Sequence, residues 1–582
     1  MNPKGLRTHD NFTYRKYNGF VMQLGISKSV SKKQKESALI MRKQTKIAAV
    51  VSAAALLALG ASMTSFAASK GTWMMVDGEW YCYDKNGDAY TNTFCSSNGK
   101  DYYVGDDGQL VRSAWVEDGS DKYFVNSSGA KITNDWRLTT PYEDEGAEEE
   151  WYYFQSTGKM AANKKITYKG KTYFFDSEGQ MLTGWVTYES KNNNTSVDED
   201  GEFNKDNSFY CDETGARVEK GWVYTTESGV EDDNADADEY WFYFKSSGKA
   251  QTGKATSING QTYLFDTEGH MLTGWVGFTG ADVAQDGKNY KYEEIGGENS
   301  KEQLSNYTDV YFCGDEDDGH AKKNKWYKTW RPEQYDAADE DNDQWWYWID
   351  KNGKVYIPST SDATKVATAY KYQLKDAALE IKNGGDTYKV TKKKVNSKDY
   401  FFNENGEMLS DFIHVKHPGS GLLADEVYYL GGSNDGSMKS GSQSVKDDNG
   451  DTYKFYFENK SGASKGTGVT GNKNGYLYNK GLLITADDYK YQLAEVLGAQ
   501  FIVNANGTIQ HGNVEYKEDG DVLIDTRKVV DKDDKTIVIY EGVTYNSATG
   551  ALKNSITGGD LRTFRNDLDI DVNKVMDFSQ EN

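Results

Sequence analysis

The stretch Thr262–Trp275 reads TYLFDTEGHMLTGW, and it decides the fold class of this chain. Ninety residues earlier, Thr172–Trp185 reads TYFFDSEGQMLTGW, so the two stretches agree at 11 of 14 positions. Each begins with aromatic residues typical of a β-strand, continues through an Asp-x-x-Gly turn and ends in Gly-Trp. Such self-similarity indicates one small structural unit that is used many times, rather than a single large core.

Degraded copies of this stretch recur along the chain and predict a series of β-hairpins. The copies are WYCYDKNG (80–87), YYVGDDG (102–108), KYFVNSSG (122–129), FYCDETG (209–215), WYWIDKNG (346–353), YFFNENGEML (400–409) and VTYNSATG (543–550). In the opening stretch we expect the aromatic strand to pair with a second short strand at His270–Leu272, beyond the Gly turn. A lone hairpin is marginal in water. Stacked hairpins that bury each other's rings are therefore expected, which makes the predicted fold an all-β, repetitive β-hairpin solenoid.

Acidic insertions interrupt the repeats at 142–150, 227–239 and 336–344, each just before a Trp-rich strand. The pattern YKYQL, at 370–374 and 489–493, predicts either added strands or a few short helices in the C-terminal half. We expect four parts: a leader with a signal peptide at 1–67, compact hairpin repeats at 68–290, insertion-rich repeats at 291–485, and degenerate repeats with a C-terminal tail at 486–582.

The N-terminal segment has the pattern of a signal peptide. Basic Met41–Lys46 precedes the apolar run Ile47–Leu59, and Ser65-Phe66-Ala67 predicts cleavage after Ala67, with Met41 as a candidate start. The alternative is a membrane anchor, for which an apolar run of 13 residues is short. Residues 1–67 hold 11 basic and 2 acidic residues, so removing them changes the net charge from −23 to −23 − 9 = −32. That charge disfavours nucleic acid and anionic membrane surfaces, and it favours cations and neutral sugars.

Gly-Trp pairs, the run Trp-Tyr-Tyr-Phe at 151–154 and regularly spaced turn glycines resemble the cell-wall-binding repeat family. This family includes choline-binding modules, glucan-binding repeats and the repetitive tails of clostridial toxins. The resemblance is clearest over about 73–275, recognisable to about 412 and faint to about 550. It implies an extracellular, non-catalytic hairpin solenoid that binds choline-bearing teichoic acid or polysaccharide. The acidic insertions depart from the compact pattern of the family.

The resemblance also implies ligand sites between consecutive hairpins, where ring faces surround a quaternary ammonium. Each ring face contributes about 0.5–2 kcal/mol to such a site. The candidates are the Gly-Trp residues Trp185, Trp222 and Trp275, the strand aromatics Trp151, Tyr153, Trp241 and Tyr243, and Met181 and Met271 as the floor of a cage. The alternative for each ring is that it only packs the solenoid.

The sequence carries no recognisable catalytic, metal or cofactor motif. It lacks G-x-S-x-G and a phosphate loop, no HExxH context surrounds His414 and His417, and the acidic runs do not match a calcium loop. We therefore expect a secreted, surface-associated binding protein without enzymatic activity, whose first candidate ligand is choline or a similar teichoic-acid group. The alternatives are polysaccharide (glucan) binding on aromatic platforms, and a structural or adhesive surface protein whose partner is a host or neighbour protein.

Overall fold

A computed structural model of the chain describes residues 71–564 apart from short segments. The segments outside it are 143, 145, 192–193, 200, 231–236, 286–287, 297–303, 316, 336–342, 360–365, 376–377, 382–386, 419–425, 487–490, 512–514, 519–520, 526–537, 540–544 and 554–560. The predicted leader and signal peptide at 1–67 lie outside the described residues. The chain divides into two compact units, Met1–Ala250 and Gln251–Asn582. The predicted boundaries at 290 and 485 remain predictions.

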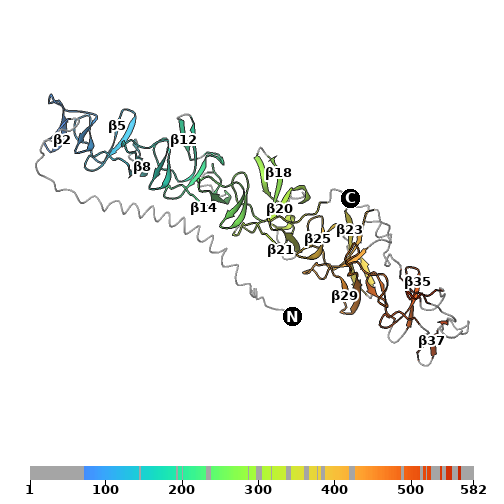
Figure 1. Ribbon diagram of the computed structural model, residues 1–582. Helices are drawn as coiled ribbons and strands as arrows, with labels where there is room; N and C mark the ends of the chain where they lie inside the picture. The colour runs from blue at the N-terminus through green and yellow to red at the C-terminus, as the bar shows by residue number, and fades with distance from the viewer. Residues whose placement is uncertain are drawn as a thin grey trace, which may run out of the picture. The chain divides into compact units, whose positions relative to one another are not determined.

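Unit 1 is a succession of antiparallel β-hairpins, as the all-β repeat prediction requires (Figure 1). Its strands are β1 (Thr72–Val76), β2 (Glu79–Tyr83), β3 (Thr93–Ser97), β4 (Lys100–Val104), β5 (Ala114–Asp118), β6 (Asp121–Val125), β7 (Asp135–Thr139), β8 (Glu150–Phe154), β9 (Lys164–Tyr168), β10 (Lys171–Phe175), β11 (Gly184–Lys191), β12 (Asn194–Asp198), β13 (Ser208–Cys211), β14 (Gly221–Thr226) and β15 (Glu239–Phe244). The strands pair two by two along the chain, from β1 with β2 to β14 with β15, except that β11 pairs with both β12 and β13.

Unit 2 continues the hairpins and merges some of them into larger sheets. Its strands are β16 (Gly253–Ile258), β17 (Gln261–Phe265), β18 (Trp275–Gln285), β19 (Lys288–Glu294), β20 (Asp309–Phe312), β21 (Lys325–Thr329), β22 (Trp345–Ile349), β23 (Ala367–Lys375), β24 (Ala378–Ile381), β25 (Thr387–Val395), β26 (Lys398–Asn403), β27 (Phe412–Lys416), β28 (Glu426–Tyr429), β29 (Gly441–Lys446), β30 (Thr452–Phe457), β31 (Gly471–Lys473), β32 (Tyr476–Asn479), β33 (Leu482–Leu483), β34 (Tyr491–Val496), β35 (Ala499–Asn504), β36 (Glu515–Glu518), β37 (Asp521–Asp525), β38 (Val538–Ile539) and β39 (Leu561–Phe564). Strands β23 to β28 form one six-stranded sheet, and β29 to β33 form a five-stranded sheet.

The first YKYQL segment lies within β23, and Tyr491–Leu493 of the second segment begins β34, whereas 489–490 lie outside the described residues. The expectation of added strands is therefore confirmed there, and the alternative of short helices at these positions is wrong. In the part of the chain that the structure describes, helical geometry is confined to η1 (Leu304–Asn306) and α2 (Pro332–Tyr335). In the same part, no helix has the length and hydropathy needed to cross a bilayer.

The hairpin of the opening stretch lies one element upstream of its expected position. Strand β17 pairs with the preceding β16 across the turn Asn259–Gly260, where φ is 50° and 79°. Positive φ at both central residues is typical of a two-residue hairpin turn, and Asn-Gly adopts it readily. The expected strand at His270–Leu272 is wrong: Met271 forms only an isolated bridge with Phe265, and the ladder partner of β17 is β16.

One recurring backbone hydrogen bond joins consecutive hairpins. At many of the described turns, the N–H two residues after the turn glycine donates to a carbonyl of the preceding hairpin. Such donor–acceptor pairs are Leu110–Trp80, Lys131–Asp101, Met160–Lys122, Met181–Trp151 and Arg217–Thr172 in unit 1, and Ala321–Thr262, Val355–Val310 and Met408–Trp346 in unit 2, at 2.7–2.9 Å. Because the donor stands at a fixed distance from the glycine, the spacing of the turn glycines in the sequence sets where hairpins join.

The turn glycines also allow consecutive hairpins to approach closely. Gly215 has φ of 77°, and a Cβ added to it would lie 2.2 Å from Sδ of Met181 in the preceding hairpin. Gly319 has φ of 54°, and its Cβ would lie 2.3 Å from Sδ of Met271. Only glycine fits such a contact and adopts this backbone conformation without strain. Met181 and Met271 therefore pack on the turn of the following hairpin.

Candidate functional site: half-buried aromatic corners

The surroundings of one strand position repeat at every third hairpin. We call this position the anchor position. It is the second residue of the first strand of each hairpin, or the first residue of β18. Along the first ten hairpins the anchor residues are Trp73, Phe94, Trp115, Trp136, Lys165, Trp185, Trp222, Lys254, Trp275 and Trp326. Residues three places apart in this series have similar surroundings. The 90-residue repeat of the sequence is thus a group of three hairpins lengthened by insertions, since Trp73 and Trp136 are only 63 residues apart.

The first class of anchor residue is a tryptophan whose indole is sealed by the next hairpin. The indole N–H donates to a backbone carbonyl, from Trp115 to Thr140 at 2.9 Å, from Trp185 to Thr226 at 2.9 Å and from Trp275 to Trp330 at 3.0 Å. Trp185 and Trp275 are only 7% and 1% exposed. The ring of Trp275 packs against Tyr347 at 4.7 Å between centroids. A ligand would reach either ring only by displacing such neighbours, and a ligand role for them stays a prediction.

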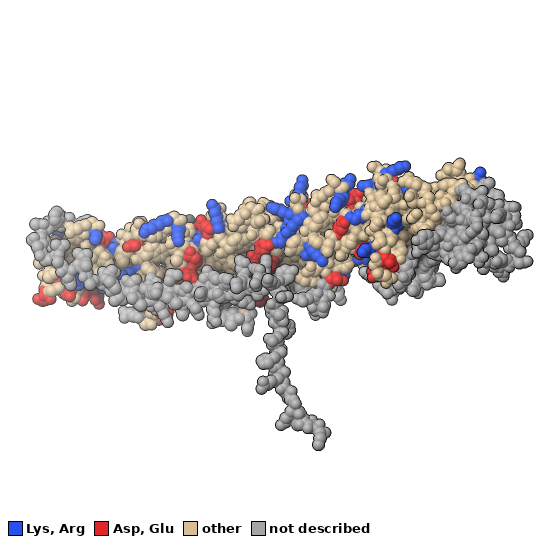
Figure 2. All heavy atoms as spheres, turned by 90° about the horizontal axis from the view of Figure 1, so that it is seen from below, with Lys and Arg blue, Asp and Glu red and all other residues tan. Residues whose placement is uncertain are grey.

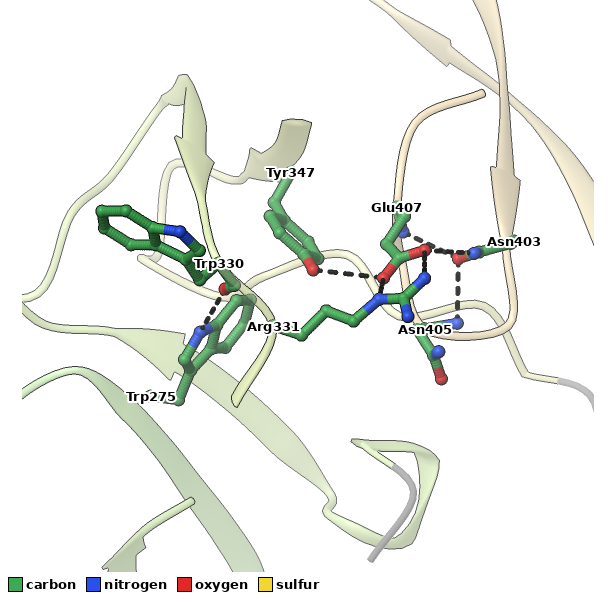
Figure 3. A network of polar contacts seen from close by, with 7 residues as sticks. All are labelled: Trp275, Trp330, Arg331, Tyr347, Asn403, Asn405 and Glu407. Atoms are coloured by element: carbon green, nitrogen blue, oxygen red, sulfur yellow. Dashed lines mark hydrogen bonds and ion pairs between the residues drawn. The ribbon is translucent and has the colours of Figure 1, made fainter. Parts of the chain in front are cut away.

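The carbonyl that accepts from the Trp275 indole belongs to Trp330, and the next residue, Arg331, takes part in a network of polar contacts (Figure 3). Arg331 follows Trp330, and its guanidinium binds the fully buried carboxylate of Glu407 through Nε and Nη2. Asn403 Nδ2 donates to the same carboxylate at 2.6 Å. Burial, and then the Glu407 carboxylate, raise the pKa of Tyr347 well above its usual range, so this phenol stays neutral. The network stabilises unit 2 and leaves this anchor closed.

The second class of anchor residue carries an internal cation on an aromatic ring. Lys165 Nζ lies 4.7 Å from the ring centroid of Tyr188, and Lys254 Nζ lies 4.6 Å from that of Tyr311. At Phe94 the anchor is itself the ring, with Lys131 Nζ 4.6 Å from its centroid. Burial lowers the pKa of Lys254, with a smaller effect from Lys354. These rings already hold an ammonium group of the chain, and Figure 2 shows Lys and Arg side chains at intervals over one described face.

The third class of anchor residue is a half-buried tryptophan that stands perpendicular to a second one. Trp136 meets Trp151 at 83° with centroids 6.4 Å apart, and it meets Tyr153 at 65° and 5.2 Å. We call these three residues the first corner. The second corner repeats this geometry with other residues: Trp222 meets Trp241 at 88° and 6.3 Å, and it meets Tyr243 at 63° and 5.1 Å. All four tryptophans keep part of their surface exposed.

Further aromatic residues surround both corners. Tyr173 lies 4.8 Å from Trp136 between centroids, and Tyr168 lies 5.9 Å away. Lys169 Nζ lies 4.9 Å from the Tyr168 centroid, so an ammonium group of the chain already contacts this ring. At the second corner, Tyr224 is 41% exposed and packs against Trp241 at 5.1 Å.

The corners belong to the hairpins that carry the acidic insertions. Segment 142–150 separates β7 from β8, and segment 227–239 separates β14 from β15. These segments hold six and seven acidic residues and no basic residue. Negative charge near an aromatic site raises the local concentration of cations. A third insertion separates β21 from β22, where Trp326 has the same anchor position. There the ring stacks on Phe402 at 5.7 Å and 5°, which leaves less of its face open.

The structure brings together some of the predicted site residues and separates others. Trp151 joins Tyr153 in the first corner, and the second corner unites Trp222, Trp241 and Tyr243. Trp185, Trp275, Met181 and Met271 lie in packing contacts between hairpins. The sequence interpretation missed Trp136 because it follows Asp135 rather than glycine. Its place two residues into a hairpin strand was the available signal. Among the described residues no group of three or more His, Cys, Asp and Glu side chains is arranged to hold a metal ion.

Two stretches of the chain match known families. Residues 147–184, which contain Trp151, Tyr153, Tyr168 and Tyr173, match the choline-binding repeat. Residues 393–408 match the cell wall binding repeat. The chain therefore carries repeats of the cell-wall-binding family, as the sequence motifs predict.

Similar proteins align with only part of this chain. Glucosyltransferase-S of Streptococcus mutans is 30% identical over 204 residues, which are 35% of this chain and 12% of that protein. Glucosyltransferase-I of Streptococcus downei is 31% identical over 247 residues, which are 41% of this chain and 13% of that protein. The chain thus spans about an eighth of the length of these relatives. Among solved structures, choline binding protein F from Streptococcus pneumoniae is 17% identical with a TM-score of 0.28, over 67% of this chain and 98% of that chain.

Proposed function

We propose that this protein attaches non-covalently to cell-wall polymer at the cell surface by binding quaternary ammonium groups, such as choline, in its two aromatic corners. The observation that carries the proposal is the repetition of one geometry. Two half-buried, perpendicular tryptophan pairs differ by only 5° and 0.1 Å, although different residues build them.

Perpendicular rings suit a compact cation better than a flat sugar. An ammonium group placed beside two perpendicular rings can contact a face of each, and the two quadrupoles would then attract it together. The acidic segments of the same hairpins attract a cation from a distance. Two corners on one polymer chain also raise the overall affinity through effective concentration. At the other described interfaces an indole or a lysine of the chain already packs on the rings, so the proposal places the ligand in the two corners.

Glucan binding is the second candidate function. It is favoured by the alignment with two glucosyltransferases and by the exposed ring of Tyr224 beside Trp241, on which a sugar face can stack. In either case the role is binding rather than catalysis, and the predicted signal peptide would bring the protein to the surface. If neither ligand binds, the third candidate is a structural or adhesive protein that contacts a host or neighbour protein.

Chromatography of the mature chain separates these functions. The protein is passed over an immobilised quaternary amine at high salt and eluted with free choline, and the run is repeated on a neutral glucan matrix. Elution by choline at high salt supports the corners. Elution by salt alone would be ion exchange by an acidic protein and would contradict them. Retention only on glucan supports the second candidate, and retention on neither matrix supports the third.

A further inference from the structure

A polar cleft of about 630 Å³ lies in unit 2, far along the chain from both corners. It is formed by the segment after β30, by the turn between β31 and β32, and by the turn at 545–550. Its lining includes three asparagines, two lysines, His511 and Ser547, and no Asp or Glu side chain. That composition is unusual in a chain with 90 acidic and 67 basic residues.

The walls of this cleft are held together by polar contacts. Asn472 Nδ2 donates to the carbonyl of Thr549 at 2.7 Å, which ties the 545–550 turn to β31. Asn472 Oδ1 accepts from the N–H of Gly475 at 2.9 Å. Both polar ends of this amide are therefore engaged, and Asn472 has a structural role that fixes the width of the cleft.

One of the two lysines, Lys473, is held by a carboxylate that does not line the cleft. Lys473 Nζ binds Glu458 Oε2 at 2.9 Å and lies 5.3 Å from the ring centroid of Tyr456. The N–H of Lys460 and the ammonium of Lys473 lower the pKa of Glu458 to about 2, so this carboxylate stays charged and keeps Lys473 in place. Glu458 is not part of the lining.

Other polar groups of the cleft are available to a ligand. Among the described residues, the amides of Asn459 and Asn474, the ammonium of Lys460 and the hydroxyl of Ser547 make no hydrogen bond or ion pair. Amides and hydroxyls can both donate to and accept from sugar hydroxyls. An ammonium group pairs with phosphate or carboxylate as a point charge. Within the described part of the chain the Lys460 ammonium makes no ion pair, so its positive charge is available to a ligand.

We propose that this cleft binds an anionic saccharide, a sugar unit that bears a phosphate or a carboxylate group. Asn459, Asn474 and Ser547 hydrogen-bond the sugar hydroxyls, and Lys460 and Lys473 contact the anionic group. This site is independent of the corners, which bind a cation. A wall polymer that carries both sugar phosphate and quaternary amine would use both sites of one molecule.

The test measures binding of three choline-free oligomers to the mature full-length chain at moderate salt. The probes are a glycerol phosphate oligomer, a galacturonate oligomer and a neutral dextran oligomer. We expect one anionic oligomer to bind and dextran to bind at least tenfold more weakly, and the preferred anion identifies the charged group. The variant Lys460→Ala/Asn474→Ala should lose at least tenfold in affinity, whereas Lys446→Ala, an exposed lysine on β29, should not change it.

Absence of binding to both anionic oligomers would overturn the proposal, as would equal binding of dextran or an equal loss in the Lys446→Ala control. The substituted cleft residues are exposed, so an unchanged melting temperature is expected and confirms that the variant is folded. The variant Trp151→Leu/Trp241→Leu should retain oligomer binding, which keeps a failure at the cleft distinct from a failure at the corners.

Discussion

Trp136 meets Trp151 at 83°, with 6.4 Å between the two ring centroids. The same relationship returns at Trp222 and Trp241, because equivalent anchor positions recur at every third hairpin. The hairpins between them close their own interfaces with an internal ammonium or with an indole bonded to a carbonyl. In these described hairpins the anchor residues pack within the chain, and under the proposal the corners are where a ligand binds.

Trp275 should contribute to stability and not to choline binding. Trp275→Phe removes the indole N–H that donates to Trp330 and leaves that carbonyl without its donor. We expect unit 2 to lose about 2 kcal/mol in the free energy of unfolding, from the lost hydrogen bond and the smaller ring. Denaturant unfolding followed by circular dichroism measures it. A drop in choline affinity at unchanged stability would instead make Trp275 a binding residue.

The contact between Gly215 and Met181 can be tested by a double-mutant cycle. Gly215→Ala forces a Cβ against Sδ of Met181 and requires positive φ from alanine. We expect it to destabilise unit 1 by about 2 kcal/mol, since overpacking and backbone strain add. The double variant Gly215→Ala/Met181→Ala should be destabilised by about 1 kcal/mol less than the sum of the two single variants. Strictly additive effects would show that the two hairpins do not meet at this glycine.

Removing one partner of the Arg331–Glu407 pair should lower the free energy of unfolding of unit 2, whereas replacing both partners with apolar residues should change it little. Glu407→Gln removes the buried counter-charge of the half-buried Arg331 guanidinium, and we expect a loss of about 3 kcal/mol in the stability of unit 2. Arg331→Leu/Glu407→Leu should recover most of that loss. Glu79→Gln, which removes the exposed partner of Arg112, is the control and should change stability by less than about 0.5 kcal/mol. Equal losses for Glu407→Gln and the control would contradict the burial of this network.

His414 should make unit 2 less stable in mild acid. Burial, and then the charges of Lys480 and Lys416, lower its pKa from 6.5 to about 3, and its Nδ1 lies 2.8 Å from the Tyr372 hydroxyl. Below pH 6.5 His414 binds a proton in the unfolded chain but stays neutral in the folded chain. The free energy of unfolding therefore falls as the pH drops toward 3.

Between pH 7 and pH 5 this residue should account for a loss of about 2 kcal/mol. Comparing the unfolding free energies of the parent chain and of His414→Gln over this range isolates the effect. The difference between the two proteins should change with pH in this range. A constant difference would mean that His414 titrates alike in the folded and unfolded chain.

The sequence predicted the kind of repeat better than the position of its strands. Aromatic runs and turn glycines are local signals, so they indicated hairpins and their spacing. The pairing of β16 with β17 was missed because β16 (GKATSI) has no aromatic residue, and the Asp-x-x-Gly turn after β17 looked like the hairpin tip. The site was harder, because the difference between Trp185 and Trp222 lies in residues about 40 positions away. Only the fold brings the Thr226 carbonyl within hydrogen-bond distance of the Trp185 indole N–H.

The central claim is that the two corners bind a quaternary ammonium, and calorimetric titration of the mature chain with choline tests it most directly. The measurement compares the parent chain with Trp151→Leu/Trp241→Leu, which removes one wall of each corner and keeps both anchor tryptophans. Tyr476→Ala, which removes an aromatic side chain that is 40% exposed in unit 2, is the matched control. We predict choline binding by the parent and the control, and at least a tenfold weaker affinity in the double variant. Undiminished choline binding by a folded double variant would contradict the account.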